Sequence, residues 1–315
     1  MLNTIDEYGF LERILALDRP GEENIFAFYD HRLRAVMTNP RLMLVPLDDH
    51  LVHRGDGAFE TLKYVDGKIY QLDAHLDRMG RSLHGIKLTP PCPWPEIRDI
   101  VIGVAQTGGR KRGILTIFIG RGPGGFTPDP RECAFPSLYV VARRFPQRPE
   151  SFWENGVTAC RSGIPVKPGH QVGLKTVNYL NNVLMKMEAA EKGCDYTLGF
   201  TPDNHLAEGA AENVVIVGQD GQVVIPDTTH VLVGTTLART LELLALSGIS
   251  TITRSIRESE IYDAREVILL GTSIDAVSVV RYNGRAIHDV RPGPMSRKLR
   301  AMLQDDLQKT GTPFL

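Results

Sequence analysis

The sequence lacks the marks of several protein classes. No run of about eighteen apolar residues occurs, and no basic N-terminal region leads into a long apolar stretch, so neither a membrane span nor a signal peptide is indicated. We therefore expect a cytoplasmic protein with no membrane partner. The 36 Lys and Arg residues are balanced by 37 Asp and Glu residues, and no long basic run occurs. This balance argues against nucleic acid as a partner.

Cysteine is scarce and histidine is scattered. The four cysteines lie far apart without a CxxC pair, which indicates reduced structural thiols rather than a disulfide framework or a zinc site. The nine histidines show no HxH or HExxH spacing. The sequence therefore predicts no metal site.

What is present is an ordinary globular composition. With 42% hydrophobic and 23% charged residues in 315, the chain can form about two domains with sizeable cores. Strand-like and helix-like segments alternate in both halves, which indicates an α/β (α+β) fold. The run RFPQRP at 144–149 interrupts every regular pattern, so we expect a smaller N-terminal α/β domain at 1–145 and a larger C-terminal domain at 150–315.

Regular segments can be placed in the first domain. A capping-box pattern that starts at Thr4 predicts a helix to about Leu17, and apolar spacing predicts another over 74–84, which carries Arg78. The expected strands are 25–29, 58–65, 68–72, 114–119 and 137–142.

A glycine-rich run at 120–125 formally contains GxGxxG. In a dinucleotide-binding unit this motif precedes a helix, whereas here Pro128 and Pro130 follow, which leaves no helix for a diphosphate. We expect a flexible loop instead.

The second domain repeats the alternation. A helix after Lys175 is predicted, with Thr176 as a possible cap and Gly193 as its stop, and another is predicted to open at 234–236. The apolar stripe expected on the first of these helices comprises Val177, Leu180, Leu184 and Met187. The expected strands are 196–201, 214–217, 222–225 and 267–270.

Lys175 is the most informative residue. It precedes an apolar helical pattern, and the run EGAAEN at 208–213 follows about thirty residues later. A lysine that forms a Schiff base needs a fixed, partly desolvated position, and a carboxylate that meets a pyridinium nitrogen is the usual second half of such a site. Together they predict pyridoxal phosphate as the cofactor.

Six motifs in register carry a family resemblance. They are HRGDGAFETLK at 53–63, HLDR at 75–78, LKTVNYLNNVLMKMEA at 174–189, EGAAENV at 208–214, VGTTLART at 233–240 and LLGTS at 269–273. In order and spacing they resemble the class IV aminotransferases, the fold-type IV pyridoxal-phosphate family that includes branched-chain aminotransferases, D-amino-acid transaminases and aminodeoxychorismate lyases. The resemblance implies a pseudo-barrel in the C-terminal domain and a homodimer.

The same resemblance implies roles at the cofactor. Lys175 would hold the cofactor and move the substrate proton, Glu208 would keep the pyridine nitrogen protonated, and Tyr179 would contact the phenolic oxygen. The alternatives are a solvated lysine, a glutamate in a surface pair and a core tyrosine.

Phosphate and substrate contacts are implied as well. Arg78, Thr235, Thr236 and Thr272 match the phosphate contacts, and Thr272 with Ser273 would face the substrate carboxylate. Simple helix capping is the alternative for the threonines.

Arg54 stands where branched-chain enzymes have a tyrosine, and the resemblance implies that this stretch, with Phe59, lines the substrate pocket. It would bind a substrate carboxylate, or it would pair with Asp56 or another acid.

The implied reaction is transfer of an amino group between an amino acid, branched-chain or D-configured, and a 2-oxo acid. Two alternatives stay open: a lyase that eliminates pyruvate from aminodeoxychorismate, and a non-catalytic pyridoxal-phosphate carrier.

Overall fold

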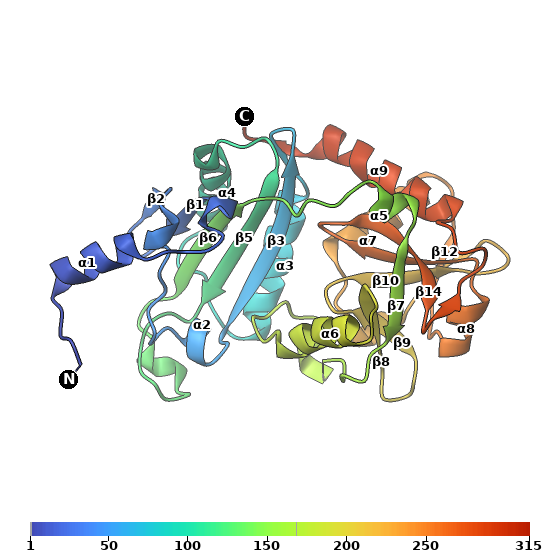
Figure 1. Cartoon of the computed structure of the whole chain (residues 1–315), viewed down its shortest axis with the longest axis horizontal. Coiled ribbons are helices and arrows are strands. Elements are labelled where there is room, and N and C mark those ends of the chain that lie inside the picture. Colours follow the sequence, from blue (N-terminus) through green and yellow to red (C-terminus); the bar gives the residue numbers. More distant parts are fainter. Residues whose placement is uncertain (1, 168) are drawn as a thin grey trace. The chain divides into compact units, whose positions relative to one another are not determined.

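A computed structural model describes residues 2–167 and 169–315, which form two compact units (Figure 1). The first unit comprises Met1–Phe145 together with Thr312–Leu315, and the second comprises Pro146–Gly311. The expected C-terminal domain ran to Leu315, whereas the last four residues belong to the first unit because they add a strand to its sheet.

The first unit is built on an antiparallel sheet. Its strand order is β16-β4-β3-β5-β6-β1-β2. The strands are β1 (Ile25–Asp30), β2 (Ala35–Met37), β3 (Gly57–Val65), β4 (Lys68–Ile69), β5 (Gly113–Gly120), β6 (Ser137–Arg143) and β16 (Thr312–Pro313). The hairpin between β3 and β4 turns through Asp66 and Gly67, both at positive φ (53° and 75°). The strand expected over 68–72 is shorter in the structure because a helix begins at Leu72.

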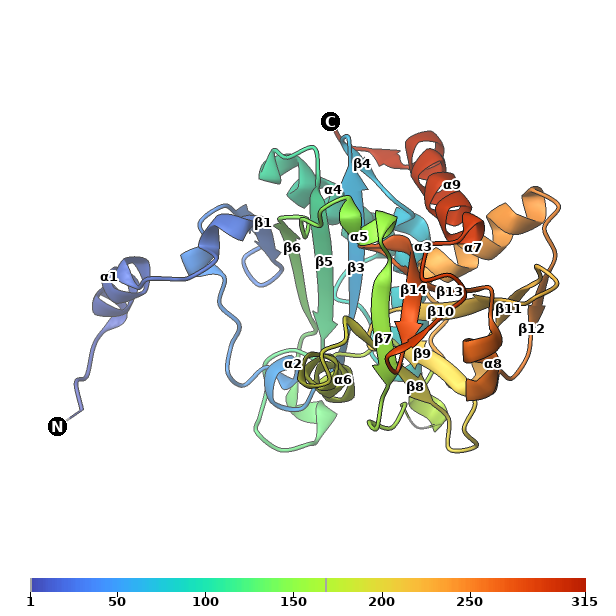
Figure 2. The same cartoon turned by 45° about the vertical axis from the view of Figure 1, so that its right-hand side comes forward.

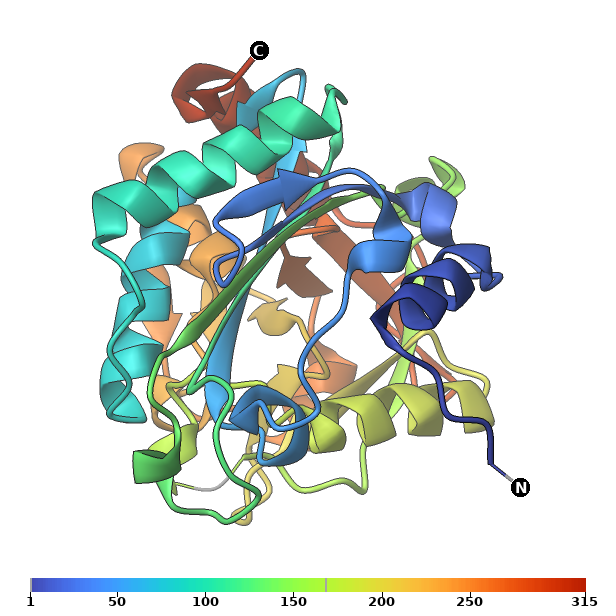
Figure 3. The same ribbon diagram turned by 90° about the vertical axis from the view of Figure 1, so that its left-hand side faces the viewer.

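Two helices cover one face of this sheet, α3 (Leu72–Gly85) and α4 (Trp94–Gly108) (Figure 3). Each buries one stripe in the sheet's core, which includes Leu76, Met79 and Leu83 from α3 and Ile97 and Val101 from α4. The predicted helix over 74–84 is therefore confirmed within one turn at each end. Helix α4 was not predicted.

Helix α1 (Glu7–Ala16) stands away from this core (Figure 2). It begins after Asp6, whose carboxylate accepts a hydrogen bond from the Gly9 N–H at 2.8 Å. The cap expected at Thr4 is wrong, because the side chain two residues later caps the helix. None of its residues is buried. The short helix α2 (His50–His53) precedes β3.

The second unit is built on a sheet that closes on itself. Its strand order is β12-β11-β10-β13-β14-β7-β8-β9, and β9 also pairs with β10. The strands are β7 (Val157–Arg161), β8 (Tyr196–Phe200), β9 (Leu206–Gly209), β10 (Asn213–Val217), β11 (Val223–Ile225), β12 (Thr251–Thr253), β13 (Glu266–Gly271), β14 (Asp275–Tyr282) and β15 (Arg285–Ala286). The six strands from β10 through β13, β14, β7 and β8 to β9 form a barrel. The predicted pseudo-barrel is confirmed.

Alternate residues of the barrel strands face two different cores. Val214, Ile216 and Leu269 belong to one core, whereas Val215 and Ile268 belong to the other, which packs under α7 (Thr235–Leu246) and α9 (Pro294–Thr310) (Figure 2). Because both faces of β10 and β13 pack against a core, apolar residues stand on both faces. Each strand is therefore a continuous apolar run in the sequence. The remaining helices are α5 (Ser151–Glu154), α6 (Leu180–Glu191) and α8 (Glu258–Asp263).

Helix α6 differs from its prediction. It begins at Leu180, five residues after Lys175, with Tyr179 rather than Thr176 at its cap position. It packs on β8 through Met185 and Ala189, so the predicted stripe is not its buried face. Leu180, Leu184 and Met187 are instead 69%, 36% and 53% exposed, which leaves an apolar surface open to solvent.

Candidate active site

The predicted site residues of the second unit gather at one rim of the barrel. In the strand register Glu208 of β9 lies opposite Asn213 of β10, and Asn213 lies opposite Leu270 of β13. The pairing of Glu208 with Asn213 is the one that closes the barrel. Strand β9 was not predicted. The position of Glu208 at the rim therefore follows from the pairing of β9 with β10 and could not be derived from the sequence.

Glu208 and Asn213 together hold the loop that precedes α7. The Glu208 carboxylate accepts a hydrogen bond from the Leu232 N–H at 3.2 Å. The Asn213 amide donates to the Leu232 carbonyl at 2.8 Å and accepts from the Gly234 N–H at 3.0 Å. A Cβ atom at Gly234 would overlap with Asn213 Oδ1, so glycine allows this close approach. Asn213 is a positioning residue that sequence reasoning missed, although it lies within EGAAEN.

The start of α7 offers hydrogen-bond donors to an anion. Thr235 and Thr236 are the first two residues of this twelve-residue helix, both 7% exposed, and the preceding Gly234 supplies no side-chain cap. The first backbone N–H groups of a helix lack intrahelical acceptors and carry partial positive charge. Together with two hydroxyl groups they can hold a phosphate.

Thr272 and Ser273 occupy the tight turn between β13 and β14, which the Ile274 N–H closes on the Gly271 carbonyl at 3.2 Å. A Cβ at Gly271 would lie 3.7 Å from Glu212 Cγ, so the turn is next to the loop that joins β9 and β10. The structure thus brings 272–273 to the same rim as Glu208.

Lys175 lies in the segment that leads to α6. Its Nζ is 3.1 Å from the Tyr179 hydroxyl and 5.2 Å from the centre of the Tyr179 ring. Helix α6 begins only at Leu180, so Lys175 lies outside the helix. The contact with Tyr179 is the evidence for a fixed amine.

A second lysine belongs to this cluster. The Nζ of Lys167 is 4.7 Å from the centre of the Tyr179 ring. Burial lowers the pKa of Lys167, while nearby Tyr179 and Glu208 act to raise it. Sequence reasoning missed Lys167 because it lies in an irregular segment with neither a helical nor a strand period.

Glu208 is the most perturbed acid of the rim. Burial raises the pKa of its carboxyl group to about 7, against the Leu232 hydrogen bond and the charges of Lys167 and Lys175, which act to lower it. The nearby Glu212 adds to the rise, although its own carboxylate bonds Lys186 at 3.0 Å. Glu208 is therefore a carboxyl group without an adjacent cation among the described residues.

Arg78 in the first unit is tied into a buried ion pair. Its guanidinium donates two hydrogen bonds to the Glu60 carboxylate, both at 2.7 Å, and His75 Nδ1 lies 2.7 Å from the same carboxylate. Burial alone would raise the pKa of Glu60, but the Arg78 hydrogen bonds and the charge of His75 lower it to about 2. This partner of Arg78 was not predicted, although Glu60 lies in the HRGDGAFETLK motif.

Arg54 and Phe59 are the other predicted residues of the first unit. Arg54 is exposed and donates to the backbone carbonyls of His53 and Phe126. The pairing with Asp56 that the sequence left open is wrong, because Asp56 forms two 2.9 Å hydrogen bonds with Arg121. Phe59 lies on β3 and stacks on Phe118 with ring centres 6.1 Å apart.

Outside the site, the structure bears on the predicted loop at 120–125 and on the four cysteines. The run at 120–125 ends β5 and continues as irregular chain with Gly122 at φ 99°, as expected for a loop. All four cysteines are free. Over 2–167 and 169–315 no cluster of His, Cys, Asp and Glu is arranged to hold a metal ion. In the same ranges no helix combines the length and apolarity needed to cross a membrane.

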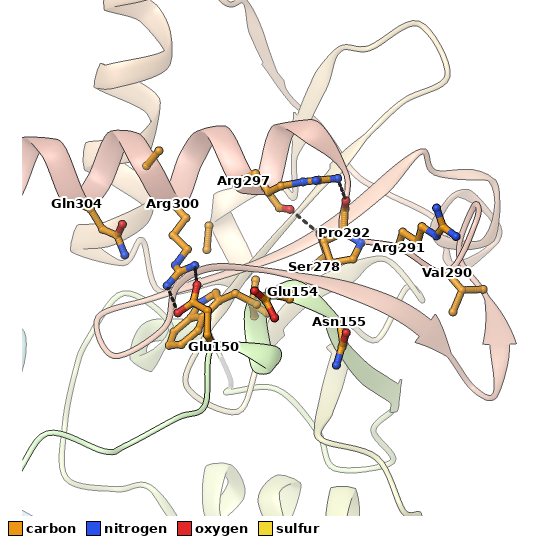
Figure 4. Close-up of a pocket in the computed structure, with 15 residues that line it drawn as sticks. Glu150, Glu154, Asn155, Ser278, Val290, Arg291, Pro292, Arg297, Arg300 and Gln304 are labelled. Atoms are coloured by element: carbon orange, nitrogen blue, oxygen red, sulfur yellow. Dashed lines mark hydrogen bonds and ion pairs between the residues drawn. The ribbon is translucent and has the colours of Figure 1, made fainter.

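A cavity of about 700 Å³ opens elsewhere on the second unit, between α5, β14 and α9 (Figure 4). Two arginines of its lining are engaged: Arg300 donates to Glu150, and Arg297 donates to the Pro292 carbonyl. None of the predicted site residues lines this cavity. This cavity is therefore not the predicted site, despite its volume.

Comparison with known proteins gives consistent matches. A family model described as amino-transferase class IV matches residues 57–282. The chloroplastic D-amino-acid transaminase of Arabidopsis thaliana is 34% identical, over 98% of this chain and 83% of that protein. A putative branched-chain-amino-acid aminotransferase of Methanocaldococcus jannaschii is 27% identical, over 85% and 92%.

Among solved structures, the branched-chain aminotransferase of the thermophilic archaeon Thermoproteus uzoniensis with norvaline superposes with a TM-score of 0.83. The aligned part covers 92% of this chain and 99% of that one, at 21% identity. At this identity the likeness shows a shared fold.

Proposed function

The chain belongs to the class IV aminotransferases, and we propose that it transfers the amino group of a D-amino acid to a 2-oxo acid with pyridoxal phosphate as its cofactor. Amino-acid transamination is the activity of the named relatives on both the D-amino-acid and the branched-chain side. The 34% identity to the plant D-amino-acid transaminase supports the choice of enantiomer. The branched-chain relative is less similar, at 27%.

The residues of the barrel rim fit this cofactor. Pyridoxal phosphate supplies an aldehyde that takes up amino groups, a pyridine ring that accepts electrons, and a phosphate. Glu208 is a carboxyl group whose pKa burial raises to about 7 against the charges of Lys167 and Lys175, which suits a partner for a protonated ring nitrogen. This observation carries the proposal, because a carboxylate in a completed ion pair has a lowered pKa.

Each residue then has a role that its position supports. The Lys175 amine would hold the cofactor covalently and, as a free amine, would take the proton from the substrate Cα. Tyr179 orients that amine through its hydroxyl group, 3.1 Å away. Glu208 keeps a proton on the ring nitrogen, and a charged hydrogen bond there restores the carboxylate that burial disfavours.

The phosphate would be held by the start of α7 and by Arg78. Thr235 and Thr236 offer hydroxyl groups and backbone N–H groups, and the loop before them is fixed by Asn213. Arg78 would add charge, with its guanidinium oriented by Glu60. Thr272 and Ser273, on the same rim as Glu208, would contact the phosphate and the substrate carboxylate.

Arg54 and Phe59 are proposed to bind substrate. Arg54 has five N–H donors, and the two carbonyls of His53 and Phe126 leave donors for a carboxylate. Loss of this contact in Arg54→Ala would raise KM by about tenfold to a hundredfold with cofactor affinity unchanged.

We also propose that the chain works as a homodimer. The exposed apolar surface of α6, formed by Leu180, Val183, Leu184 and Met187, supports an interface there. Sedimentation would report a dimer, and Leu184→Lys would weaken it. A cytoplasmic location stays a prediction of the sequence.

A panel of D- and L-amino acids tests the reaction. Each is added to the cofactor-loaded protein without a 2-oxo acid, and the visible absorption and the released products are recorded. A D-amino-acid transaminase converts the cofactor to its amine form and releases a 2-oxo acid with D-substrates only. Conversion by L-leucine alone would favour the branched-chain alternative. Pyruvate release from aminodeoxychorismate without the amine form would indicate the lyase, and no change with any compound would indicate a carrier.

A further inference from the structure

Two lysine amines share one aromatic ring in the second unit. Lys167 Nζ lies 4.7 Å from the centre of the Tyr179 ring, and Lys175 Nζ lies 5.2 Å from it. The two lysines reach the ring from different parts of the segment that joins β7 to α6. The proposed roles assign Lys175 to the cofactor and leave Lys167 without one.

Glu208 acts on both lysines and Tyr179 contacts both, while Glu212 is bound by Lys186 at 3.0 Å. Lys167 is partly buried, and none of the carboxylates in the described ranges lies within ion-pair distance of it. A cation that is shielded from water and lacks an adjacent carboxylate repels a neighbouring cation more strongly than it would in solution.

We infer that Lys167 is a positioning residue for the reaction, because its ammonium makes the amine of Lys175 less basic. This inference rests on the proposed function, in which Lys175 binds the cofactor and accepts the substrate proton. An ordinary lysine, with a pKa of about 10.4, is almost wholly protonated at neutral pH and is then neither a nucleophile nor a base. The cation of Lys167 disfavours that protonated form.

Glu208 opposes this effect, so loss of Lys167 can change the basicity of Lys175 in either direction, and the proposal requires one of them. Its carboxylate favours a protonated Lys175, whereas the ammonium of Lys167 disfavours it. Loss of Lys167 would also leave Glu208 more easily protonated, and a neutral Glu208 would make Lys175 less basic. A rise in the basicity of Lys175 without Lys167 therefore reports the direct repulsion.

The first test uses the cofactor-loaded protein. The pH at which the visible absorption changes from its protonated to its unprotonated form is measured for wild type, Lys167→Met, Lys167→Arg and Lys298→Met. Lys167→Met should raise this midpoint by about one pH unit, the size expected for a charge at several ångströms in a partly shielded site. Lys167→Arg keeps the charge and should restore the wild-type midpoint. The exposed Lys298 is a matched control and should leave it unchanged.

The second test needs no cofactor. The apo-protein is acylated at a series of pH values, and modification of Lys175 is followed by peptide mass spectrometry. Lys167→Met should shift the reaction of Lys175 to higher pH by a similar amount. If borohydride reduces no link between Lys175 and the cofactor in the wild-type protein, the proposed function is overturned. The acylation experiment would still measure the coupling of the two amines, so the two failures can be told apart.

An unchanged midpoint in both tests would overturn the role of Lys167. So would a Lys167→Met variant whose midpoint stays fixed while the KM for every amino acid rises, since that pattern belongs to a lysine that binds the substrate carboxylate. A lowered midpoint would show that Glu208 dominates, and it would equally reject the inference.

Discussion

Two glutamates on strands, one in each unit, show opposite electrostatics. Glu60 of β3 is fully buried, yet the Arg78 guanidinium and His75 hold its pKa at about 2. Glu208 of β9 has one backbone N–H as its hydrogen-bond donor, and burial raises its pKa to about 7. The first is an ion pair that the chain completes by itself. The second is a carboxyl group that no described side chain holds in an ion pair, and its proposed partner is the cofactor.

The two side chains are chemically identical, but we expect Glu60 to stabilise the fold and Glu208 to serve the reaction. Breaking a completed buried pair should cost stability, because it strands the remaining charge. Neutralising a carboxyl group that lacks a cation should cost activity and leave the fold intact. Four experiments can break or sharpen the comparison.

The largest effect is expected from Glu208→Gln. The amide fits the same space but cannot hold a proton on the cofactor ring as a carboxylate does, so kcat should fall by about 10³-fold or more. Cofactor affinity should change little, and so should the melting temperature of the apo-protein near pH 4.5, where the Glu208 carboxyl group is still protonated in the fold. Steady-state kinetics and thermal unfolding measure both. Glu212→Gln, in the loop that follows β9, is the matched control, and an equal loss of kcat there would remove the special role of Glu208.

Glu60→Gln should show the opposite pattern, with its main effect on the stability of the fold. It leaves the Arg78 guanidinium buried without its counter-charge, so the free energy of unfolding should fall by about 3 to 5 kcal/mol. Urea unfolding measures this. Asp73→Asn removes the exposed ion pair with Arg98 and should cost less than about 1 kcal/mol. Equal losses in the two variants would show that the buried pair does not stabilise the fold.

The pH dependence of stability should differ in sign. Glu208 has a raised pKa in the fold, so its contribution to apo-protein stability is complete below about pH 4.5 and is lost as the pH rises through about 7. The loss amounts to about 3 kcal/mol. Glu60 has a lowered pKa, so its contribution is complete above about pH 4.5 and is lost as the pH falls towards 2.

Unfolding free energies of wild type and each Gln variant, measured from pH 2 to 8, isolate these contributions. The wild-type advantage over Glu208→Gln should shrink as the pH rises above about 4.5. A difference that is flat between pH 5 and 8 would mean that Glu208 titrates as it does in the unfolded chain.

The smallest effect is expected from Asn213→Ala. It removes the amide that holds the Leu232 carbonyl and the Gly234 N–H, and thereby loosens the start of α7. Cofactor Kd should rise by about tenfold, which corresponds to about 1.4 kcal/mol. Fluorescence titration of the apo-protein measures this. Asn155→Ala, at an exposed position, should bind as wild type does, and an unchanged Kd in Asn213→Ala would show that the helix start needs no such support.

The residues that we propose to carry the chemistry were easier to single out in the sequence than the residues around them. Lys175, Glu208 and the threonine pair of α7 stand in short motifs, which local sequence can reveal. Glu60 could not be assigned to Arg78, because their contact depends on how β3 packs against α3. Lys167 lies in irregular chain, where neither period gives a signal.

Hydrophobic periodicity predicted many of the helices and strands but missed helix α4 and strand β9, and it was weaker for their buried faces. The helix after Lys175 exists, but Leu180, Leu184 and Met187 of the predicted apolar stripe are exposed, because Met185 and Ala189 are the buried residues of this helix. Strand β9 escaped prediction since Glu208 and Gly209 are both poor strand formers. Its place in the barrel depends on its partners β8 and β10 rather than on its own sequence.

The return of the chain to its first sheet has a consequence for synthesis. β16 pairs with β4, and Phe314 packs edge-on against Tyr64 with ring centres 5.2 Å apart. A ribosome makes residues 312–315 after the whole second unit, so the first sheet is left with an open edge at β4 while the barrel strands emerge. An unpaired edge invites pairing with other chains. A nascent molecule that stalls before residue 312 would therefore expose an unfinished sheet, which a chaperone could recognise.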